Sequence, residues 1–355
     1  MTVHDPILTA AQRARATIPD DAAMLRAAAD LTRQLSTANP RIYWADMLAS
    51  ALIGYAGLAG AIMADHVGAA IACGVVSMLA LYRAASFIHE LTHIRKDALP
   101  GFRLAWNLAV GIPLMIPSFM YEGVHTQHHA RTRYGTADDP EYLPLALMKP
   151  WSLPLFILIA SLAPIGLILR FGLLTPASLI IPPLRSKVVA EFSALSINPA
   201  YRRRAPEGDF ARQWAWQEAG ACLFALALVG SVFVAGWKPL LVYMAVHSAM
   251  TVINQVRTLV AHLWENEGEP MTVTAQYLDS VNVPPPGHLP ALWAPVGLRY
   301  HALHHLLPSV PYHALAEAHR RLIAILEGES SYHRGNYRGL LPLVSKIARS
   351  TMTVR

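Results

Sequence analysis

Residues 69–93 read AAIACGVVSMLALYRAASFIHELTH, an apolar run that ends in two histidines. The run from Ala69 to Ile88 is long enough to cross a lipid bilayer, since a membrane helix needs about 20 residues. Residues four positions apart lie on the same face of a helix, so His89 and His93 point in the same direction. This stretch therefore predicts a membrane-spanning helix that carries two candidate metal ligands at one end.

The composition of the whole chain also indicates an integral membrane protein. Hydrophobic residues make up 54% of the 355 residues and charged residues only 15%, whereas about a quarter of a soluble domain is charged. The net charge is +6, and its basic residues lie in loops between apolar runs, which favours contact with anionic lipid over binding of nucleic acid. The only cysteines, Cys73 and Cys222, lie in apolar runs and indicate neither a disulfide framework nor a zinc ribbon.

Three further apolar runs predict three more membrane-spanning helices. The four predicted spans are 43–64, 69–88, 218–235 and 239–261. Lysine and arginine are frequent after the second span and before the third, which places these ends in the cytoplasm by the positive-inside rule. Prolines interrupt two other apolar stretches, 104–120 and 151–183, and Arg170 interrupts the latter, so we expect interfacial or re-entrant helices there. The predicted fold is an all-α integral membrane domain with four transmembrane helices, interfacial helices and a cytoplasmic cap.

Composition also divides the chain into three segments. Residues 1–40 are polar and rich in alanine and arginine, and we expect an amphipathic cytoplasmic segment there. Residues 41–330 hold all four predicted spans and form the predicted membrane domain. Residues 331–355 form a basic C-terminal tail.

Three histidine clusters carry the chemistry that the sequence indicates. The first is HELTH at 89–93, the second is HTQHH at 125–129, and the third is HALHH at 301–305. Residues three or four apart face together on a helix, whereas an adjacent residue is rotated by about 100°. Each HxxHH cluster can therefore offer ligands to two metal ions. The candidate ligands are His89, His93, His125, His128, His129, His301, His304 and His305.

Two histidines near the end of the fourth predicted span lead to opposite expectations. His262 lies at the cytoplasmic end of the span, beside the third cluster in the predicted topology, and is a ninth candidate ligand. His247 lies fifteen residues earlier, which at 1.5 Å per residue is about 22 Å deeper. We therefore expect His247 to be a packed residue of the span and not a ligand.

The donor set narrows the choice of metal. Imidazole sites without cysteine suit iron, copper, nickel or zinc. Structural zinc sites close with four ligands, so eight or nine histidines are too many for one ion and suit two. A saturated C–H bond is inert to acid–base chemistry, so two redox metals beside an apolar bundle indicate oxygen activation directed at a hydrocarbon.

The three clusters resemble the histidine boxes of the membrane fatty acid desaturase family, and the resemblance extends from about Tyr43 to Leu326. It implies a four-span bundle with a cytoplasmic cap and a non-haem di-iron centre that uses O2 to desaturate or hydroxylate acyl chains. The eight box histidines carry over as iron ligands. The additional histidine that the family carries at the end of its last span resembles His262.

The resemblance also implies residues that orient the ligands. Asp138 and Asp139 after the second box, and Tyr300 before the third, resemble flanking residues of the family. In some relatives an asparagine one turn before the additional histidine contacts iron through water. That position is Thr258 here, and Asn254 lies one turn further back.

An electron donor is implied as a separate protein. The sequence carries no fused cytochrome b5 haem motif and no dinucleotide-binding fingerprint. We therefore expect electrons to come from a ferredoxin, or from cytochrome b5 with its reductase. The basic cytoplasmic loops could dock such an acidic carrier.

Desaturation of a lipid acyl chain is the predicted reaction, and hydroxylation or ketolation of a lipid, sterol-like or carotenoid substrate is the alternative. HELTH also fits the HExxH motif of zinc metalloproteases, with Glu90 as the general base. That hypothesis leaves the second and third clusters unexplained. A histidine-lined metal transporter would need histidines at mid-membrane depth, whereas these lie at one face.

Overall fold

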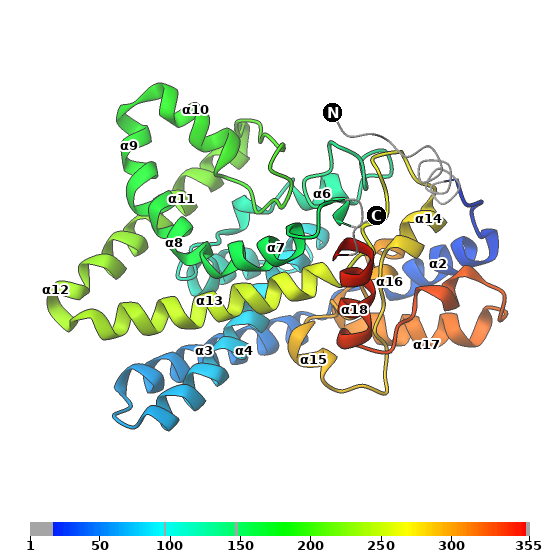
Figure 1. Cartoon of the computed structure of the whole chain (residues 1–355), viewed down its shortest axis with the longest axis horizontal. Helices are drawn as coiled ribbons and strands as arrows, with labels where there is room; N and C mark the ends of the chain where they lie inside the picture. The colour runs from blue at the N-terminus through cyan, green and yellow to red at the C-terminus, as the bar shows by residue number, and fades with distance from the viewer. Residues whose placement is uncertain (1–16, 96, 146–147, 353–355) are drawn as a thin grey trace.

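The computed structural model describes residues 17–95, 97–145 and 148–352. The described part is helical, and its β-structure consists of isolated bridges that join His262 to Ser280 and Asn282 to both Tyr300 and Asn336. In Figure 1 the long helices run along the longest axis of the molecule, and the short helices of a cap gather at one end of them. The all-helical fold predicted from the sequence is therefore present.

The elements follow one another along the chain in two stretches that meet at the cap. The first half comprises α2 (Ala22–Leu35), α3 (Pro40–Met63), α4 (Val67–His93), α5 (Phe102–Trp106), η1 (Asn107–Gly111), η2 (Ser118–Met120), α6 (His125–His128), α7 (Ser152–Ser161), α8 (Ala163–Ile168), η4 (Leu169–Leu174), α9 (Thr175–Ile180) and α10 (Pro182–Glu191). The second half comprises α11 (Gly208–Gly230), α12 (Val232–Ala235), α13 (Trp237–Leu259), α14 (Val273–Asp279), α15 (Pro290–Trp293), α16 (His301–Leu306), η5 (Tyr312–Ala314), α17 (Leu315–Ile325), η6 (Ser331–Gly335) and α18 (Leu340–Met352).

By length and composition, five helices of the described chain could cross a membrane. They are Pro40–Met63, Val67–His93, Ala163–Ile180, Gly208–Ala235 and Trp237–Leu259. Four of them match the predicted spans. Ala163–Ile180 is the additional one, and it lies in the stretch where interfacial or re-entrant helices were expected.

The features that seemed to interrupt Ala163–Ile180 are accommodated within it. Pro164 and Pro176 each stand in the first turn of a helical segment, where the missing N–H group costs no hydrogen bond. Arg170 is buried and binds the carboxylate of Glu218 on α11, with 2.6 Å between Nη2 and Oε1. Arg185 binds the other oxygen of Glu218 at 2.7 Å. The paired charge lets the helix keep an apolar exterior.

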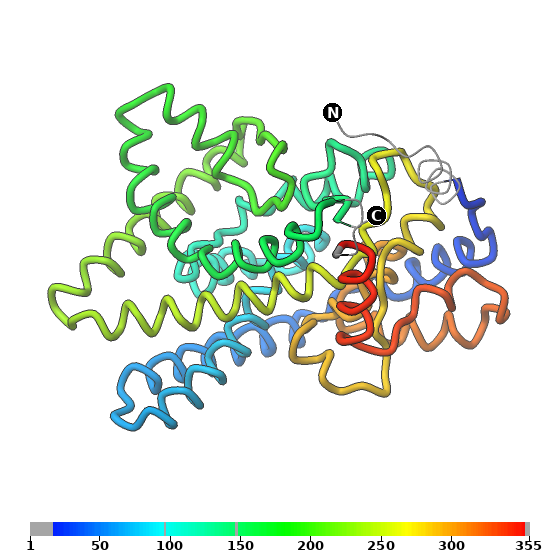
Figure 2. The backbone as a smooth tube through the Cα atoms, in the orientation of Figure 1, coloured from blue at the N-terminus to red at the C-terminus, as the bar shows by residue number. Residues whose placement is uncertain are grey.

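The hairpin of α3 and α4 is closely packed. Asn39 caps the start of α3 by accepting a hydrogen bond from the Arg41 N–H, and Pro40 occupies the first helical position. A Cβ atom at Gly57 would lie 2.9 Å from the backbone nitrogen of Ser77. Small residues at such points let two membrane helices approach each other. In Figure 2 the two helices run side by side along their whole length.

The outer face of the long helices is apolar and exposed. Leu52 on α3 is 73% exposed, and Phe233 and Val234 on α12 are 91% and 92% exposed. Contiguous apolar surface of this kind is typical of contact with lipid or another protein. The fold is therefore that of a multi-helix membrane protein with a cap at one end.

The cap includes parts of both terminal segments. Helix α2 packs on α17, where Met24 and Leu31 share an apolar cluster with Leu322 (Figure 1). Helix α18 packs Leu343 and Ile347 into the cluster that contains Trp264. Residues 1–16 of the predicted N-terminal segment and 353–355 of the predicted tail lie outside the described residues. The division into three segments stays a prediction.

Candidate metal centre

All nine predicted ligands meet at the boundary between the long helices and the cap. They form two groups, and within each group one donor atom of every residue lies within 4.8 Å of the others. The five-histidine group consists of His89, His93, His125, His129 and His304. The four-histidine group consists of His128, His262, His301 and His305.

The two HxxHH clusters divide their histidines between the groups. Helix α6 and the residue after it give His125 and His129 to the five-histidine group and His128 to the four-histidine group. Helix α16 does the converse, because His301 and His305 join the four-histidine group and His304 joins the other. Residues four apart thus stay together, and the histidine between them turns to the second group, as the rotation of a helix requires.

The Nε2 atoms of the histidines face one another across each group. His301 and His262 bring their Nε2 atoms to 2.9 Å, and His125 and His129 bring theirs to 3.0 Å. Both nitrogens of His89 are buried without a hydrogen-bond partner among the described residues. Buried polar atoms without a partner are costly, and two facing Nε2 atoms can share only one proton. A cation between the rings would satisfy these atoms, so the residues fit a metal in each group.

Asp139 fixes the orientation of His128 in the four-histidine group. The Nδ1 atom of His128 lies 2.9 and 3.0 Å from the two oxygens of Asp139, which is fully buried. Asp139 also accepts hydrogen bonds from the backbone nitrogens of Gly135 and Glu141, both at 2.8 Å. Gly135 has φ of +69°, and a Cβ atom there would lie 2.8 Å from Asn266. The turn thus needs glycine, and it holds the carboxylate that points Nε2 of His128 inward.

A tyrosine and an aspartate play the same part for His262. The Nδ1 atom of His262 lies 2.8 Å from the Tyr134 hydroxyl, which donates to Asp279 at 2.9 Å. Because the hydroxyl proton is directed to Asp279, Nδ1 of His262 donates and its Nε2 is left without a proton. Tyr142 also donates to Asp279 at 2.9 Å. This chain of hydrogen bonds sets the tautomer that can bind a metal.

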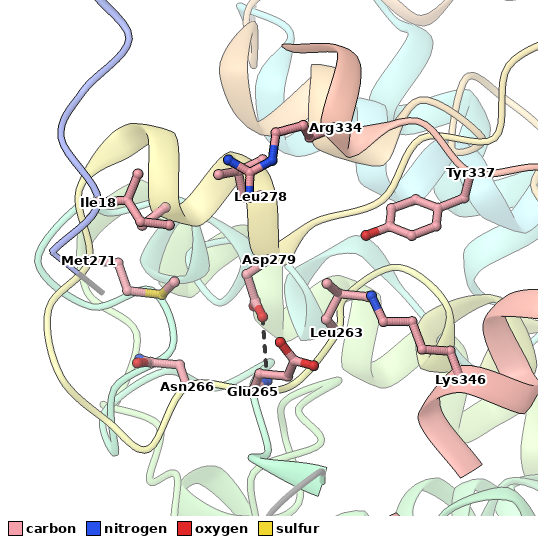
Figure 3. Close-up of a pocket in the computed structure, with 11 residues that line it drawn as sticks. Ile18, Leu263, Glu265, Asn266, Met271, Leu278, Asp279, Arg334, Tyr337 and Lys346 are labelled. Carbon is pink, nitrogen blue, oxygen red and sulfur yellow. Dashed lines mark hydrogen bonds between the residues drawn. The ribbon is translucent and has the colours of Figure 1, made fainter. Parts of the chain in front are cut away.

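Asp279 also lies at the edge of a cavity of about 200 Å³. Figure 3 shows Asp279 beside Glu265, whose backbone nitrogen donates to it, with Arg334 and Lys346 among the surrounding side chains. The cavity is on the cap and not between the histidine groups.

Glu141 orients His125 in the five-histidine group. The Nδ1 atom of His125 lies 2.8 Å from Glu141, and Tyr121 donates to the other oxygen of Glu141 at 2.7 Å. Burial raises the pKa of Glu141 to about 7. A part of Glu141 is therefore protonated near neutral pH, and its hold on His125 is weaker than that of a full carboxylate.

Glu90 anchors α4 to the cap. It accepts hydrogen bonds from the Tyr43 hydroxyl and, at 3.0 Å, from the backbone nitrogen of Tyr312. Its second oxygen lies 3.5 Å from Nδ1 of His89. Glu90 is thus engaged in packing two elements together, which is not the solvent-facing position of a metalloprotease base. All nine histidines have a place in the two groups, whereas the protease hypothesis uses only two of them.

Other predicted orienting residues lie away from the histidine nitrogens. Asp138 is exposed, and Tyr300 packs its ring against His319 at 5.4 Å while its carbonyl accepts from the backbone of His304. Among the described residues no side-chain hydrogen bond joins Asp138, Tyr300, Thr258 or Asn254 to a histidine of either group. Asn254 instead accepts from Arg257 at 3.1 Å. Of these five predicted residues, only Asp139 contacts a candidate ligand through its side chain.

His247 lies outside both groups, as the helix arithmetic predicts. It is buried in α13, and its ring stands 5.6 Å from that of Tyr243. Sequence reasoning missed Tyr121, Tyr134 and Asp279. Tyr121 has a local signal, because it lies four residues before His125, but the other two reach the site from distant segments.

Electrostatics separates His128 from the other histidines outside the membrane-spanning helices. Burial lowers the pKa of His125, His129 and His304 well below 6.5, and neighbouring histidines lower it further. The same holds for His262, His301 and His305. For His128, burial acts in the same direction, but Asp139 outweighs it and raises the pKa above 6.5. Six of these seven side chains are thus neutral, which metal binding requires.

The fold and site define a membrane protein with two adjacent all-histidine metal sites at the end of a helical bundle. The sequence model of the fatty acid desaturase family matches residues 64–336, and the chain belongs to this family. It is also 48% identical over 331 residues to a ceramide hydroxylase of Caulobacter vibrioides (strain NA1000 / CB15N), and the match covers 93% of this chain and 94% of that protein. No solved structure matches the chain. The family resemblance inferred from the histidine boxes is thereby confirmed.

Proposed function

We propose that this protein is a membrane-bound, O2-dependent di-iron hydroxylase that acts on ceramide. The observation that carries the proposal is the 48% identity to a ceramide hydroxylase over nearly the whole length of both chains. It favours the hydroxylation alternative over the desaturation predicted from the histidine boxes. Hydroxylation consumes O2, two electrons and two protons, inserts one oxygen atom into a C–H bond and releases the other as water.

The nine histidines are the proposed ligands, with one iron in each group. Bound iron would supply the oxidising power that breaks an unactivated C–H bond with O2. The protein's own part is to hold the Nε2 atoms in place. Asp139, Glu141 and Tyr134 do so by binding the opposite ring nitrogens of His128, His125 and His262. Burial of the rings keeps bulk water away from the reacting centre.

The topology and the electron supply are further parts of the proposal. We place the histidine groups on the cytoplasmic side, because basic residues are frequent in the segments that adjoin them. Arg202, Arg204 and Arg212 are exposed, and Arg202 and Arg204 belong to the segment before α11. These cations would attract an acidic carrier such as a ferredoxin or cytochrome b5. The substrate would enter from the lipid that surrounds α4 and α13.

The test uses the purified full-length protein in lipid nanodiscs, with ceramide, a reduced electron carrier and 18O2. We expect a product that contains one 18O atom, measured by mass spectrometry, and two iron ions per chain. His304→Ala, with its iron content measured in parallel, is the matched control and should form no product. A product that lacks two hydrogens and carries no 18O would identify a desaturase and contradict the proposal.

A further inference from the structure

Arg257 is a buried cation close to the candidate metal centre. It lies on α13, five residues before His262. Its Nη2 donates to Asn254 at 3.1 Å, and its Nε is buried without a hydrogen-bond partner. Within the described chain no carboxylate lies within 4.0 Å of its guanidinium. Arg170, by contrast, is paired with Glu218.

An arginine without a counter-charge is costly in a membrane-spanning helix. Such residues are rare there, face the interior of the bundle, and mark the paths of substrates or ions. A guanidinium carries five N–H donors, and the hydrogen bond to Asn254 uses only one of them. The remaining donors are therefore suited to an acceptor that the protein itself does not provide.

Arg257 also lies near the reacting centre. Helix α13 packs against α4, which carries His89. After burial, the charge of Arg257 contributes to the lowered pKa of His262 and, with His262 itself, to that of His301. Five residues correspond to about 7.5 Å along a helix. The guanidinium is thus placed where a lipid from the bundle would meet the four-histidine group.

We infer that Arg257, held by Asn254, donates hydrogen bonds to the carbonyl oxygen at the head of the substrate's acyl chain. The inference rests on the proposed function, in which this oxygen belongs to the amide of ceramide. An acyl chain offers no other polar atom, so this contact fixes which carbon lies beneath the histidines. Arg257 is a specificity-determining residue of the binding site, and Asn254 is its positioning residue.

This role makes the two kinds of measurement respond differently. Removing the guanidinium removes a charged hydrogen bond to the substrate, which should lower kcat/KM roughly 10- to 150-fold. It also removes a cation that the folded protein leaves uncompensated, so the melting temperature should stay constant or rise. A purely structural arginine would instead lower the melting temperature together with the activity.

The test compares Arg257→Gln and Arg257→Lys with the wild-type enzyme in nanodiscs. Arg320→Gln, at an exposed site on α17, is the control for loss of an arginine. Three lipids of equal chain length are supplied: ceramide, an ether analogue that replaces the amide and so lacks the carbonyl, and the free fatty acid. The readouts are kcat/KM, the position of the new hydroxyl group, the iron content and the melting temperature.

We expect wild type to prefer ceramide over the ether, and Arg257→Gln to lose that preference and to spread the hydroxyl over several carbons. Arg257→Lys should recover part of the preference, because it keeps the charge but not the fork of donors. Iron content should be unchanged in all variants. The inference is overturned if Arg257→Gln keeps the preference and the hydroxyl position, or if it acts only on the fatty acid. Wild type that oxygenates none of the three lipids would instead refute the proposed function.

Discussion

The two histidine groups lie side by side but are held differently. In the four-histidine group, two rings have buried acidic support: Asp139 binds His128 directly, and Asp279 acts on His262 through Tyr134. In the five-histidine group, Glu141 supports His125. The two ligands on α4 and the histidine after α6 have no comparable partner, and His93 and His129 are partly exposed.

The difference separates a rigid site from a more accessible one. A metal site whose ligands are already oriented binds its ion with less rearrangement. We therefore expect the four-histidine group to bind iron more tightly and the five-histidine group to exchange it more easily. The exposed edge at His93 and His129 is also the more open side for small molecules to approach.

Removing one ligand from each group is the strongest test of this difference. Changes to residues that orient ligands typically cost 10- to 100-fold in metal affinity or activity, so loss of a ligand should cost more than about 100-fold in activity. We expect His301→Ala and His93→Ala to retain one iron each and to lose activity. Metal analysis of the purified variants provides the check. A variant with two irons and full activity would show that the deleted histidine is not a ligand.

Changes to the two carboxylates that contact histidines should rank the groups. Asp139→Asn should weaken metal binding at the four-histidine group by about 10- to 100-fold. Glu141→Gln should have a smaller effect, near the lower end of this range, because burial raises the pKa of Glu141 to about 7 and it is already partly neutral. Competition with a chelator measures both affinities. A larger loss for Glu141→Gln would reverse the ranking.

Tyr134→Phe tests the indirect support of His262. The change removes the hydroxyl between His262 and Asp279 but leaves Asp279 bonded to Tyr142. The loss should be about 1 kcal/mol of stability, the usual contribution of one hydrogen bond, with a modest decrease in iron affinity. Thermal melting in detergent and chelator competition measure the two effects. Tyr142→Phe is the matched control, since it removes a bond to Asp279 without touching His262.

The pH dependence of the metal-free protein should be the weakest signal. Six centre histidines have pKa values lowered below 6.5, so the unfolded chain takes up protons as the pH falls below that value while the folded chain does not, and stability decreases. The raised pKa of His128 acts the other way, because its stabilisation is present below 6.5 and lost as the pH rises through the folded value.

We therefore expect the melting temperature of the metal-free protein to fall between about pH 7 and 5. Asp139→Asn should make the fall steeper, because it removes the interaction that favours charged His128. A melting temperature that rises toward pH 5 would contradict the assignment of neutral rings.

The parts of this protein that the sequence predicts are those with local signals. Four spans follow from long apolar runs, and the division of each HxxHH cluster follows from the rotation of a helix. The fifth apolar helix was not predicted, because the charge that neutralises Arg170 is on Glu218, 48 residues away. Tyr134 lies 128 residues from His262, and no local pattern connects them. Asp139 and Asp138 are adjacent, yet the turn buries the first and exposes the second.

The pairing of Arg170 with Glu218 has a consequence for the biosynthesis of the protein. An unpaired arginine near the middle of a membrane helix costs about 3 kcal/mol to insert. Because Ala163–Ile180 leaves the ribosome before α11, its counter-charge does not yet exist when it reaches the membrane. We expect this helix to wait at the edge of the insertion machinery until Glu218 arrives, so that the two helices enter the lipid together. A nascent chain halted before Gly208 would therefore leave Ala163–Ile180 outside the bilayer.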